Sequence, residues 1–250
     1  MGALHEGHIS LILEAKGPNT LVIASIFVNP TQFNNPSDLE HYPRMEEKDI
    51  ALLEKAGCDI AFLPSISEMY PEAHKGHWDY GLLSSSLEGK FRPGHFDGVL
   101  TIVKRLFEAV SPDRAFFGEK DFQQLAHIKR LAKEEFPSIE VIGCPTVRES
   151  DGLAMSSRNL RLSAEERKIA AIISAILFDM KEKKADFTPS ELEGYGRSQF
   201  ELAPGIELEY LEIVDQKTFA PVADWADSVE PIILVAAYVG SVRLIDNLML

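Results

Sequence analysis

Apolar residues follow two patterns in the first part of the chain. In some stretches they recur three and four positions apart, the spacing of one helix face, and in others they form short continuous runs. Continuous runs are typical of strands covered on both faces in a parallel sheet. Helices and strands that alternate along the chain predict a Rossmann-like α/β domain. The predicted helices are residues 7–16, 45–56, 98–110 and a segment opened by residues 118–121, and the predicted strands are residues 21–28, 59–64, 114–117 and 139–143.

The pattern changes near residue 160, where we place a domain boundary. Two capping boxes, residues 163–166 and 188–191, each open a predicted helix. Helices followed by strands indicate an α+β arrangement. The sequence therefore predicts an α/β protein, with a Rossmann-like parallel-sheet domain over residues 1–160 and a smaller C-terminal α+β domain over residues 161–250. The strands predicted in the second domain are residues 206–214, 232–239 and 242–245.

Charge and cysteine content narrow the possible partners. The chain has 39 acidic and 25 basic residues and a formal net charge of −14, whereas nucleic-acid binding requires a basic surface. Cys58 and Cys144 lie far apart, which excludes a disulfide scaffold or a Cys-X-X-Cys zinc site. No apolar run reaches membrane-spanning length, and no signal peptide is recognisable. We expect a cytoplasmic protein without nucleic-acid or membrane partners.

Two histidines three positions apart open the chain. His5 and His8 lie at the start of the helix predicted over residues 7–16, where free backbone N–H groups and the helix dipole favour an anion. Imidazole donors there can follow charge that develops on a phosphate. The alternatives for an isolated His-X-X-His are a metal site or a surface segment. A second such segment, residues 74–77, is predicted to be a solvated loop, and the glycine-rich segment 89–98 is also predicted to be a loop.

Other polar residues are predicted to reach the same edge of the sheet, because the carboxyl ends of parallel strands share one edge. The set contains phosphate donors and neutral amides, but no nucleophile paired with a base and no Cys/His cluster, and the chain has no P-loop sequence. This inventory suits adenylyl or phosphoryl transfer, in which positioning and charge stabilisation dominate. The residues are His5, His8, Asn29, Gln32, Lys120, Asp121, Gln124 and Met155–Arg158.

Two further polar residues are less directly connected to this chemistry. Asn29 either braces its loop or contacts substrate. Asp49 lies on the helix predicted over residues 45–56, and a single carboxylate on a helix is usually solvated, so we leave Asp49 outside the site. The residues of this helix predicted to face inward are Ile50, Leu52 and Leu53.

Several blocks of sequence carry a resemblance to a known family that runs from Met1 to the C-terminus. In chain order they are MGALHEGH (1–8), FVNPTQF (27–33), YPR (42–44), GKFRPGHFDGV (89–99), FGEKDFQQL (117–125), CPTVRESDGLAMSSRN (144–159) and VAAYVGSVRLIDN (235–247). With these blocks in this order, the chain resembles the pantothenate synthetase (pantoate–β-alanine ligase) family, within the HIGH-type nucleotidylyltransferase group. The resemblance implies that the carboxylate of pantoate attacks the α-phosphate of ATP and releases pyrophosphate, and that the amine of β-alanine then displaces AMP.

The resemblance also implies roles for single residues. His8 would be the proton donor, with His5 and Lys120 at the phosphates, and Gln32 and Gln124 would bind pantoate, Gln32 also contacting β-alanine. Val147 would touch adenine through its backbone, and the loop 155–158 would close over the triphosphate. Mg²⁺ would accompany the ATP phosphates without a predicted protein ligand, and the enzyme would be a homodimer. The implied ATP-binding residues are Met1, Gly2, Ala3, Leu4, His5, Glu6, Gly7, His8, Gly118, Glu119, Lys120, Asp121, Val147, Met155, Ser156, Ser157 and Arg158.

Two alternative interpretations remain. Another HIGH-type adenylyltransferase, acting on a mononucleotide, would need a basic or aromatic-lined pocket in place of Gln32 and Gln124. A truncated, non-catalytic relative that only dimerises is disfavoured, because every expected site position is filled. Family members carry a strand before the residue that matches Met1, so the resemblance implies that a central strand of about 5–6 residues is missing from the sheet. We expect such a gap to lower both stability and activity.

Overall fold

The computed structural model describes residues 1–34, 36–72 and 76–250. Contacts between Cα atoms divide the chain into two compact units, Met1–Val147 and Arg148–Leu250. Residues 148–160, which the sequence assigned to the first domain, group with the C-terminal unit. The assignment of domains stays a prediction. His74 and Lys75, in the second His-X-X-His segment, lie outside the described residues.

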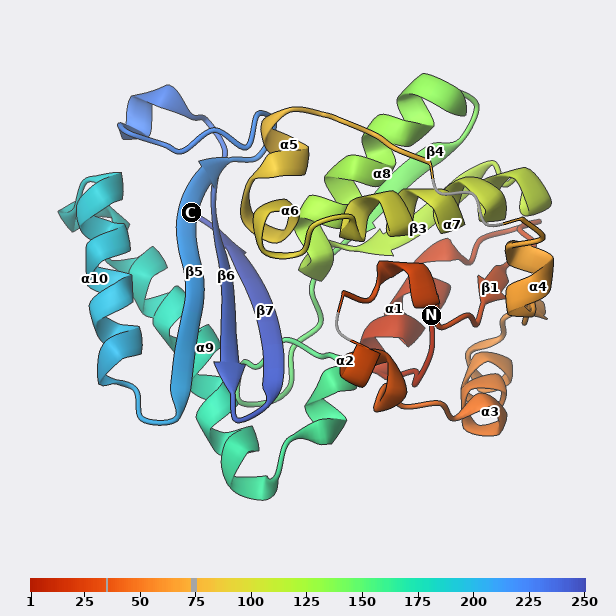
Figure 1. The fold of residues 1–250 in the computed structure, drawn as a ribbon, viewed down its shortest axis with the longest axis horizontal. Helices are drawn as coiled ribbons and strands as arrows, with labels where there is room; N and C mark the ends of the chain where they lie inside the picture. The colour runs from red at the N-terminus through yellow and green to blue at the C-terminus, as the bar shows by residue number, and fades with distance from the viewer. Residues whose placement is uncertain (35, 73–75) are drawn as a thin grey trace. The chain divides into compact units, whose positions relative to one another are not determined.

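Helices and strands alternate in the N-terminal unit, and its strands pair in parallel. Strand β1 (Ile23–Ser25) pairs with β2 (Ile60–Phe62), and β3 (Arg114–Gly118) pairs with β4 (Glu140–Cys144). The predicted α/β class is confirmed, and within the described residues these strands form two separate pairs. The helices of the unit are α1 (Glu6–Ala15), α2 (Pro36–Glu40), α3 (Glu46–Ala56), α4 (Ile66–Met69), α5 (Leu82–Ser85), α6 (Leu87–Phe91), α7 (His95–Val110) and α8 (Phe122–Glu135), with 3₁₀ turns at Pro30–Gln32 and Glu119–Asp121 (Figure 1).

The backbone of Met1 lies along the side of β1 that faces away from β2. Its amino group donates to the Ser25 carbonyl at 2.9 Å, and its carbonyl accepts from the Phe27 N–H at 2.8 Å. The intervening Ile26 directs its N–H the other way, to the Phe62 carbonyl at 2.9 Å. The chain therefore runs from the edge of this strand pair directly into α1, the helix that carries the two histidines.

The glycine-rich segment 89–98 is largely helical, so the loop prediction was wrong. The segment completes α6, and α7 begins as early as His95. Gly94 joins the two helices with φ of +76°, a left-handed conformation that glycine adopts without strain. The three residues Arg92–Gly94 therefore form a short connection between two helices in place of the expected loop. The apolar faces of α7 and α8 share a core whose buried residues include Val99, Leu100, Ile102, Val103, Phe107, Ile128 and Leu131.

Helix α3 buries two of the three residues predicted to face inward. Leu53 is buried and Leu52 packs against the core as expected, but Ile50 is 40 % exposed, whereas Asp49 is only 1 % exposed. The carboxylate thus takes the inward position that the sequence pattern gave to an apolar residue. The core beside α3 includes the buried residues Leu4, Ile12, Val22, Ala24, Ile26 and Leu53.

The C-terminal unit is an antiparallel sheet packed against two helices. Helices α9 (Ala164–Glu182) and α10 (Pro189–Leu202) begin at the two predicted capping boxes. The strand order is β5-β6-β7, and the central strand is buried along almost its whole length (Figure 1). Helices and sheet share one apolar core, which confirms the α+β pattern. The strands are β5 (Ile206–Asp215), β6 (Pro231–Val239) and β7 (Val242–Met249), and 3₁₀ turns lie at Ser157–Arg161, Lys184–Asp186 and Trp225–Asp227.

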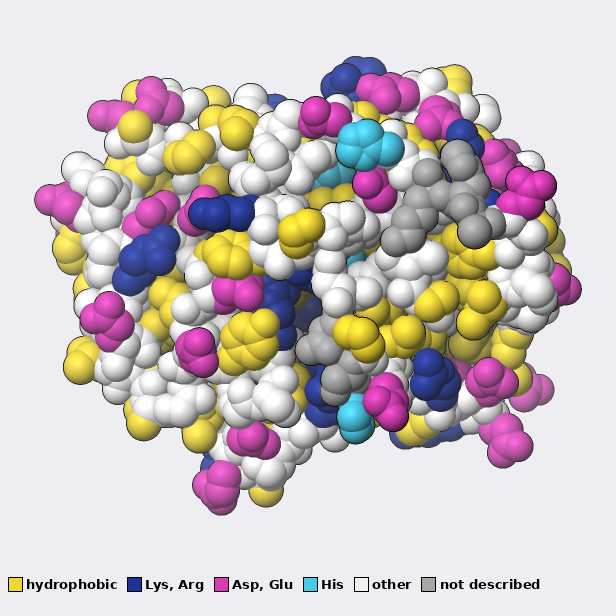
Figure 2. Space-filling model, in the orientation of Figure 1, with side chains coloured by type: hydrophobic (Ala, Val, Ile, Leu, Met, Phe, Trp, Pro, Cys, Tyr) yellow, Lys and Arg dark blue, Asp and Glu magenta, His cyan; other side chains and the backbone are white. Residues whose placement is uncertain are grey.

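Acidic side chains are spread widely over the surface. On the face shown in Figure 2, Asp and Glu side chains lie scattered among single Lys and Arg side chains. This distribution matches the strongly negative net charge of the chain. No helix built from the described residues combines the length and the apolar character needed to cross a membrane.

Two buried histidines couple the stability of the N-terminal unit to pH. Burial lowers the pKa of His95 from 6.5 to about 3 and that of His127 from 6.5 to about 4. His127 stacks on Phe96 with 3.8 Å between ring centroids, and its Nδ1 lies 2.8 Å from the Gln123 carbonyl. In the unfolded chain both rings regain an ordinary pKa and bind protons more readily. The free energy of unfolding is therefore undiminished above pH 6.5 and decreases as the pH falls towards 4.

We expect the substitution His127→Gln to reduce the loss of melting temperature between about pH 7 and about pH 5, because glutamine does not titrate. Thermal melts at the two pH values test this. The control is His77→Gln. His77 is exposed, and Asp97 raises its pKa, so protonation of His77 stabilises the folded protein at low pH instead of destabilising it. The loss of His77 therefore does not reduce the decrease of the melting temperature between the two pH values. A His127→Gln melting temperature that falls as steeply as that of the unchanged protein would contradict the assignment.

Candidate active site

The two histidines predicted at the start of a helix lie side by side there. His5 immediately precedes α1 in an extended conformation, and the His8 N–H donates to the His5 carbonyl at 2.7 Å. The His5 N–H in turn donates to Nδ1 of His8 at 3.3 Å, and the two ring centroids are 4.1 Å apart. Both imidazoles therefore lie at a helix N-terminus, where the backbone attracts anions.

The surroundings of His8 favour its neutral form. Burial is the largest cause that lowers the pKa of His8 from 6.5 to about 2, followed by the positive charges of His5, the N-terminal amino group and Lys120. Because the charge of Lys120 acts on the pKa of His8, Lys120 is a neighbour of the histidine pair. A bound anion would act in the opposite direction and raise the pKa of His8. The positive charges around His8 therefore favour the binding of an anion at this site.

Lys120 reaches this site from the carboxyl end of β3. The strand ends at Gly118, and Lys120 lies in the 3₁₀ turn before α8. Its side chain is largely buried, and its Nζ is 3.7 Å from Oδ1 of Asp121. The structure therefore brings together three predicted residues, His5, His8 and Lys120, from two segments that lie far apart in sequence.

Asn29 braces the loop that carries Gln32. Its Nδ2 donates to Oε1 of Gln32 at 3.2 Å and to the Gly98 carbonyl at 3.1 Å. Its Oδ1 accepts from the Tyr70 hydroxyl at 2.6 Å and from the Thr31 hydroxyl at 3.0 Å. The buried Asn29 side chain is thus fully used within the protein, which favours the bracing role over direct contact with substrate.

The α6–α7 segment holds the backbone of Gln32. The Gln32 carbonyl lies 2.9 Å from Nδ1 of His95 and accepts from Arg92 at 3.3 Å. Gly98 permits the close approach of α7, because a Cβ at this position would lie 2.4 Å from the Thr31 carbonyl oxygen. The motif GKFRPGHFDGV, noted in the sequence for its resemblance, therefore supports the loop that carries Gln32.

Two adjacent glutamines in α8 have different surroundings. Gln123 is buried; it accepts from the Glu88 N–H at 3.0 Å and donates to the Leu83 and Ser86 carbonyls. Gln124 is half-buried, and within the described residues its amide makes no hydrogen bond. Gln123 is thus committed to the fold, whereas the predicted ligand residue Gln124 retains its donors and acceptor.

The remaining predicted ATP-binding residues are divided between the two units. Val147 is half-buried at the end of the N-terminal unit, and Met155–Arg158 belongs to the C-terminal unit. Ser157 is buried, and the Ser156 hydroxyl accepts from the Arg158 N–H at 3.3 Å. The 3₁₀ turn Ser157–Arg161 thus takes up the second half of the predicted loop, and Met155 and Ser156 precede it without regular structure.

A buried ion pair fixes the segment that leads to this turn. Arg148 donates from Nη1 to Oδ2 of Asp246 at 2.7 Å and from Nη2 to Oδ1 at 2.9 Å. Arg148 also forms an isolated β-bridge with Ala154, next to the predicted loop. The paired, planar geometry orients the arginine firmly on β7. The sequence did not single out Arg148, although it belongs to one of the family blocks.

Asp49 is a second residue that the sequence analysis left out. Its two carboxylate oxygens accept from the Ala3 N–H at 2.8 Å and from the Leu4 N–H at 2.7 Å. Helical periodicity could not indicate these bonds, because they join residues far apart in the chain. One feature of the sequence could have indicated that Asp49 is buried: it lies four positions before Leu53, on the face of the helix that was predicted to point inward.

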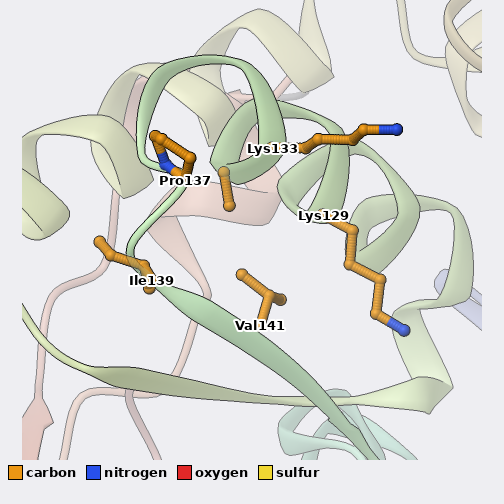
Figure 3. Close-up of a pocket in the computed structure, with 6 residues that line it drawn as sticks. Lys129, Lys133, Pro137, Ile139 and Val141 are labelled. Carbon is orange, nitrogen blue, oxygen red and sulfur yellow. The ribbon is translucent and has the colours of Figure 1, made fainter.

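A separate cavity lies between α8 and β4. Its volume is about 310 Å³, and Figure 3 shows Lys129 and Lys133 on α8 beside Pro137, Ile139 and Val141. None of these residues belongs to the predicted site. Among the described residues, His, Cys, Asp and Glu side chains form no cluster of three that could hold a metal.

Comparisons with known proteins agree with this geometry. The family model described as Pantoate-beta-alanine ligase matches residues 1–249. A pantothenate synthetase from Bacteroides thetaiotaomicron is 50 % identical over 99 % of this chain and 88 % of its own length. One from Cytophaga hutchinsonii is 49 % identical over 100 % of this chain and 89 % of its own length.

Solved structures show the same similarity in three dimensions. The crystal structure of pantothenate synthetase from Thermus thermophilus superposes with a TM-score of 0.94 at 44 % identity, covering 99 % of this chain and 90 % of that one. The pantoate-beta-alanine ligase from Francisella tularensis, complexed with beta-gamma ATP and beta-alanine, gives a TM-score of 0.81 at 39 % identity, covering 100 % and 87 %.

The fold and these similarities thus define an α/β ligase. The chain belongs to the pantoate-beta-alanine ligase family. This confirms the resemblance on which the predicted reaction rests, and it excludes the alternative of an adenylyltransferase from another family. The roles of the individual site residues stay predictions.

We expect Gly98→Ala to destabilise the N-terminal unit by about 1–3 kcal/mol, because the added methyl group collides with the Thr31 carbonyl and pushes the Gln32 loop away. Denaturant unfolding measures the change. The control is Gly194→Ala in α10, where the methyl group meets nothing within 4 Å and should stabilise the helix by about 0.5–1 kcal/mol. Stabilisation by both substitutions would show that Gly98 is not needed for close packing.

Proposed function

We propose that this chain ligates pantoate to β-alanine at the expense of ATP, through a pantoyl-adenylate intermediate. The observation that carries the proposal is the gathering of His5, His8 and Lys120 at the N-terminus of α1. We infer that this is a phosphate site, in a chain that has no P-loop sequence. The related Francisella tularensis ligase, whose complex holds beta-gamma ATP and beta-alanine, supports both as ligands here.

In the first half-reaction, a carboxylate oxygen of pantoate bonds to the α-phosphorus of ATP. The bond between this phosphorus and the pyrophosphate oxygen breaks, and negative charge develops on the departing phosphates. We assign Lys120, His5 and the N–H groups at the start of α1 to this charge. His8 is neutral before ATP binds, and the phosphates raise its pKa so that it can donate a proton to the leaving group.

In the second half-reaction, the nitrogen of β-alanine bonds to the acyl carbon of the adenylate. The bond from this carbon to the AMP oxygen breaks, and the nitrogen releases its proton to solvent. We assign Gln32 and Gln124 to pantoate, and Gln32 also to β-alanine, because an amide both donates and accepts hydrogen bonds. Asn29 donates a hydrogen bond to Oε1 of Gln32. The Nε2 group of Gln32 can therefore donate to a substrate carboxylate.

We assign ATP binding to Met1–His8, Gly118–Asp121, the Val147 backbone and the segment Met155–Arg158. We propose that Mg²⁺ accompanies the substrate and is bound chiefly by the ATP phosphates. Both cysteines are free, which suits a reducing compartment, and we propose that the enzyme works in the cytoplasm. From the family resemblance we also propose that it is a homodimer.

The nucleotide product tests the adenylate route. With ATP, Mg²⁺, pantoate and β-alanine, we expect pantothenate, AMP and pyrophosphate in equal amounts, because the bond broken in ATP lies at the α-phosphorus. Chromatography of the nucleotides measures the products. Replacement of pantoate by a mononucleotide is the control and should give no pyrophosphate. Formation of ADP would count directly against the intermediate.

We expect Lys120→Ala and His8→Ala each to slow adenylate formation by about 10²–10³-fold, because each removes a group that stabilises charge in the transition state. Single-turnover formation of pyrophosphate measures the rate. Lys129→Ala is the matched control, since Lys129 is an exposed lysine on α8 outside the site. A variant with unchanged single-turnover adenylation would remove that residue from the mechanism.

A further inference from the structure

The carboxylate of Asp49 accepts hydrogen bonds from the backbone of a turn at the start of the chain. The N–H groups of Ala3 and Leu4 are consecutive, and both donate to it, at 2.8 and 2.7 Å. All three residues are buried, so these bonds are shielded from water. Consecutive N–H groups that converge on one anion form a nest, an arrangement that elsewhere binds phosphate. In this chain the protein itself fills the nest.

The turn is held in a conformation that alanine rarely adopts. Ala3 has φ of +49°, in the left-handed region, where its Cβ crowds the backbone. Such a residue persists only where the surrounding structure holds it. The two hydrogen bonds to the charged Asp49 acceptor provide that restraint. Without the carboxylate, the turn would lose the acceptor of two buried donors.

The restrained turn leads directly into the histidine pair. Leu4 is followed by His5, whose N–H donates to Nδ1 of His8. A change in the direction of the Ala3–Leu4 backbone therefore moves both imidazoles. Displacement of a catalytic group by about 1 Å can slow a reaction by about 10²-fold. Helix α3 thus controls the histidine site through one side chain.

We infer that Asp49 is a positioning residue for the first half-reaction, an inference that rests on the proposed adenylation at His5 and His8. Asp49 acts through the backbone of Ala3 and Leu4. Its two oxygens are used by these N–H groups. Loss of Asp49 should therefore slow adenylate formation more than the later attack by β-alanine. Only adenylate formation releases the phosphates that the histidines bind.

Two substitutions test the inference. In Asp49→Asn the amide oxygen can accept one N–H, but the amide NH₂ group would face the other N–H. In Asp49→Glu both oxygens and the charge remain, but the side chain is longer by one methylene group, so the turn is displaced while its donors stay satisfied. The glutamate variant keeps the test decisive if the asparagine variant does not fold. Glu47→Gln, an exposed carboxylate on the same helix, is the matched control.

The two half-reactions are measured separately at a temperature well below each melting temperature. Pyrophosphate release with ATP and pantoate reports the first, and aminolysis of supplied pantoyl adenylate by β-alanine reports the second. We expect both Asp49 variants to slow the first by about 10–10²-fold with a much smaller effect on the second, and we expect Glu47→Gln to change neither. A folded variant with unchanged adenylation, or with both steps slowed equally, would overturn the inference. Absence of pyrophosphate release by the unchanged protein would instead overturn the proposed function.

Discussion

The paired hydrogen bonds from the Ala3 and Leu4 N–H groups to the Asp49 carboxylate hold the turn that leads into α1. The position of that first helical turn sets the positions of His5 and His8. The same helix packs against β3, whose carboxyl end leads to Lys120. A negative charge buried on α3 therefore organises a site that we propose for other anions, the phosphates of ATP. The two roles are compatible, because the carboxylate binds the turn before the helix while the imidazoles lie at the helix start itself.

The other proposed ligand segments follow the same design, with irregular backbone held by a buried polar side chain. Asn29 joins the Gln32 loop to Gly98 on α7. Arg148, paired with Asp246 on β7, fixes the strand-like segment before Met155. A buried polar group is costly without partners but rigid when all its bonds are made. Such braces let loops hold reactive groups as firmly as helices do.

The histidines of the chain illustrate how position decides chemistry. His8, His95 and His127 all have a pKa lowered by burial. His8 and His95 both lie in the first turn of a helix, but of the three only His8 lies beside a second imidazole and a lysine. His95 supports the Gln32 backbone, and His127 stacks in the core. A depressed pKa alone therefore does not identify the proposed catalytic histidine. The surrounding charges and the free N–H groups of α1 do.

Local periodicity in the sequence was sufficient for most helices, for the parallel strands and for the capping boxes of α9 and α10, because these depend on neighbours within a few positions. The histidine pair could likewise be assigned to a helix start, and the family resemblance supplied its chemistry. The tertiary structure alone decided that Asp49, and not Ile50, is buried on α3, and which of Gln123 and Gln124 belongs to the fold. It also converted the segment 89–98 from a predicted loop into helices packed on the Gln32 loop. In each case a partner distant in sequence supplied the hydrogen bonds or the contact surface, and no pattern of neighbouring residues contains that information.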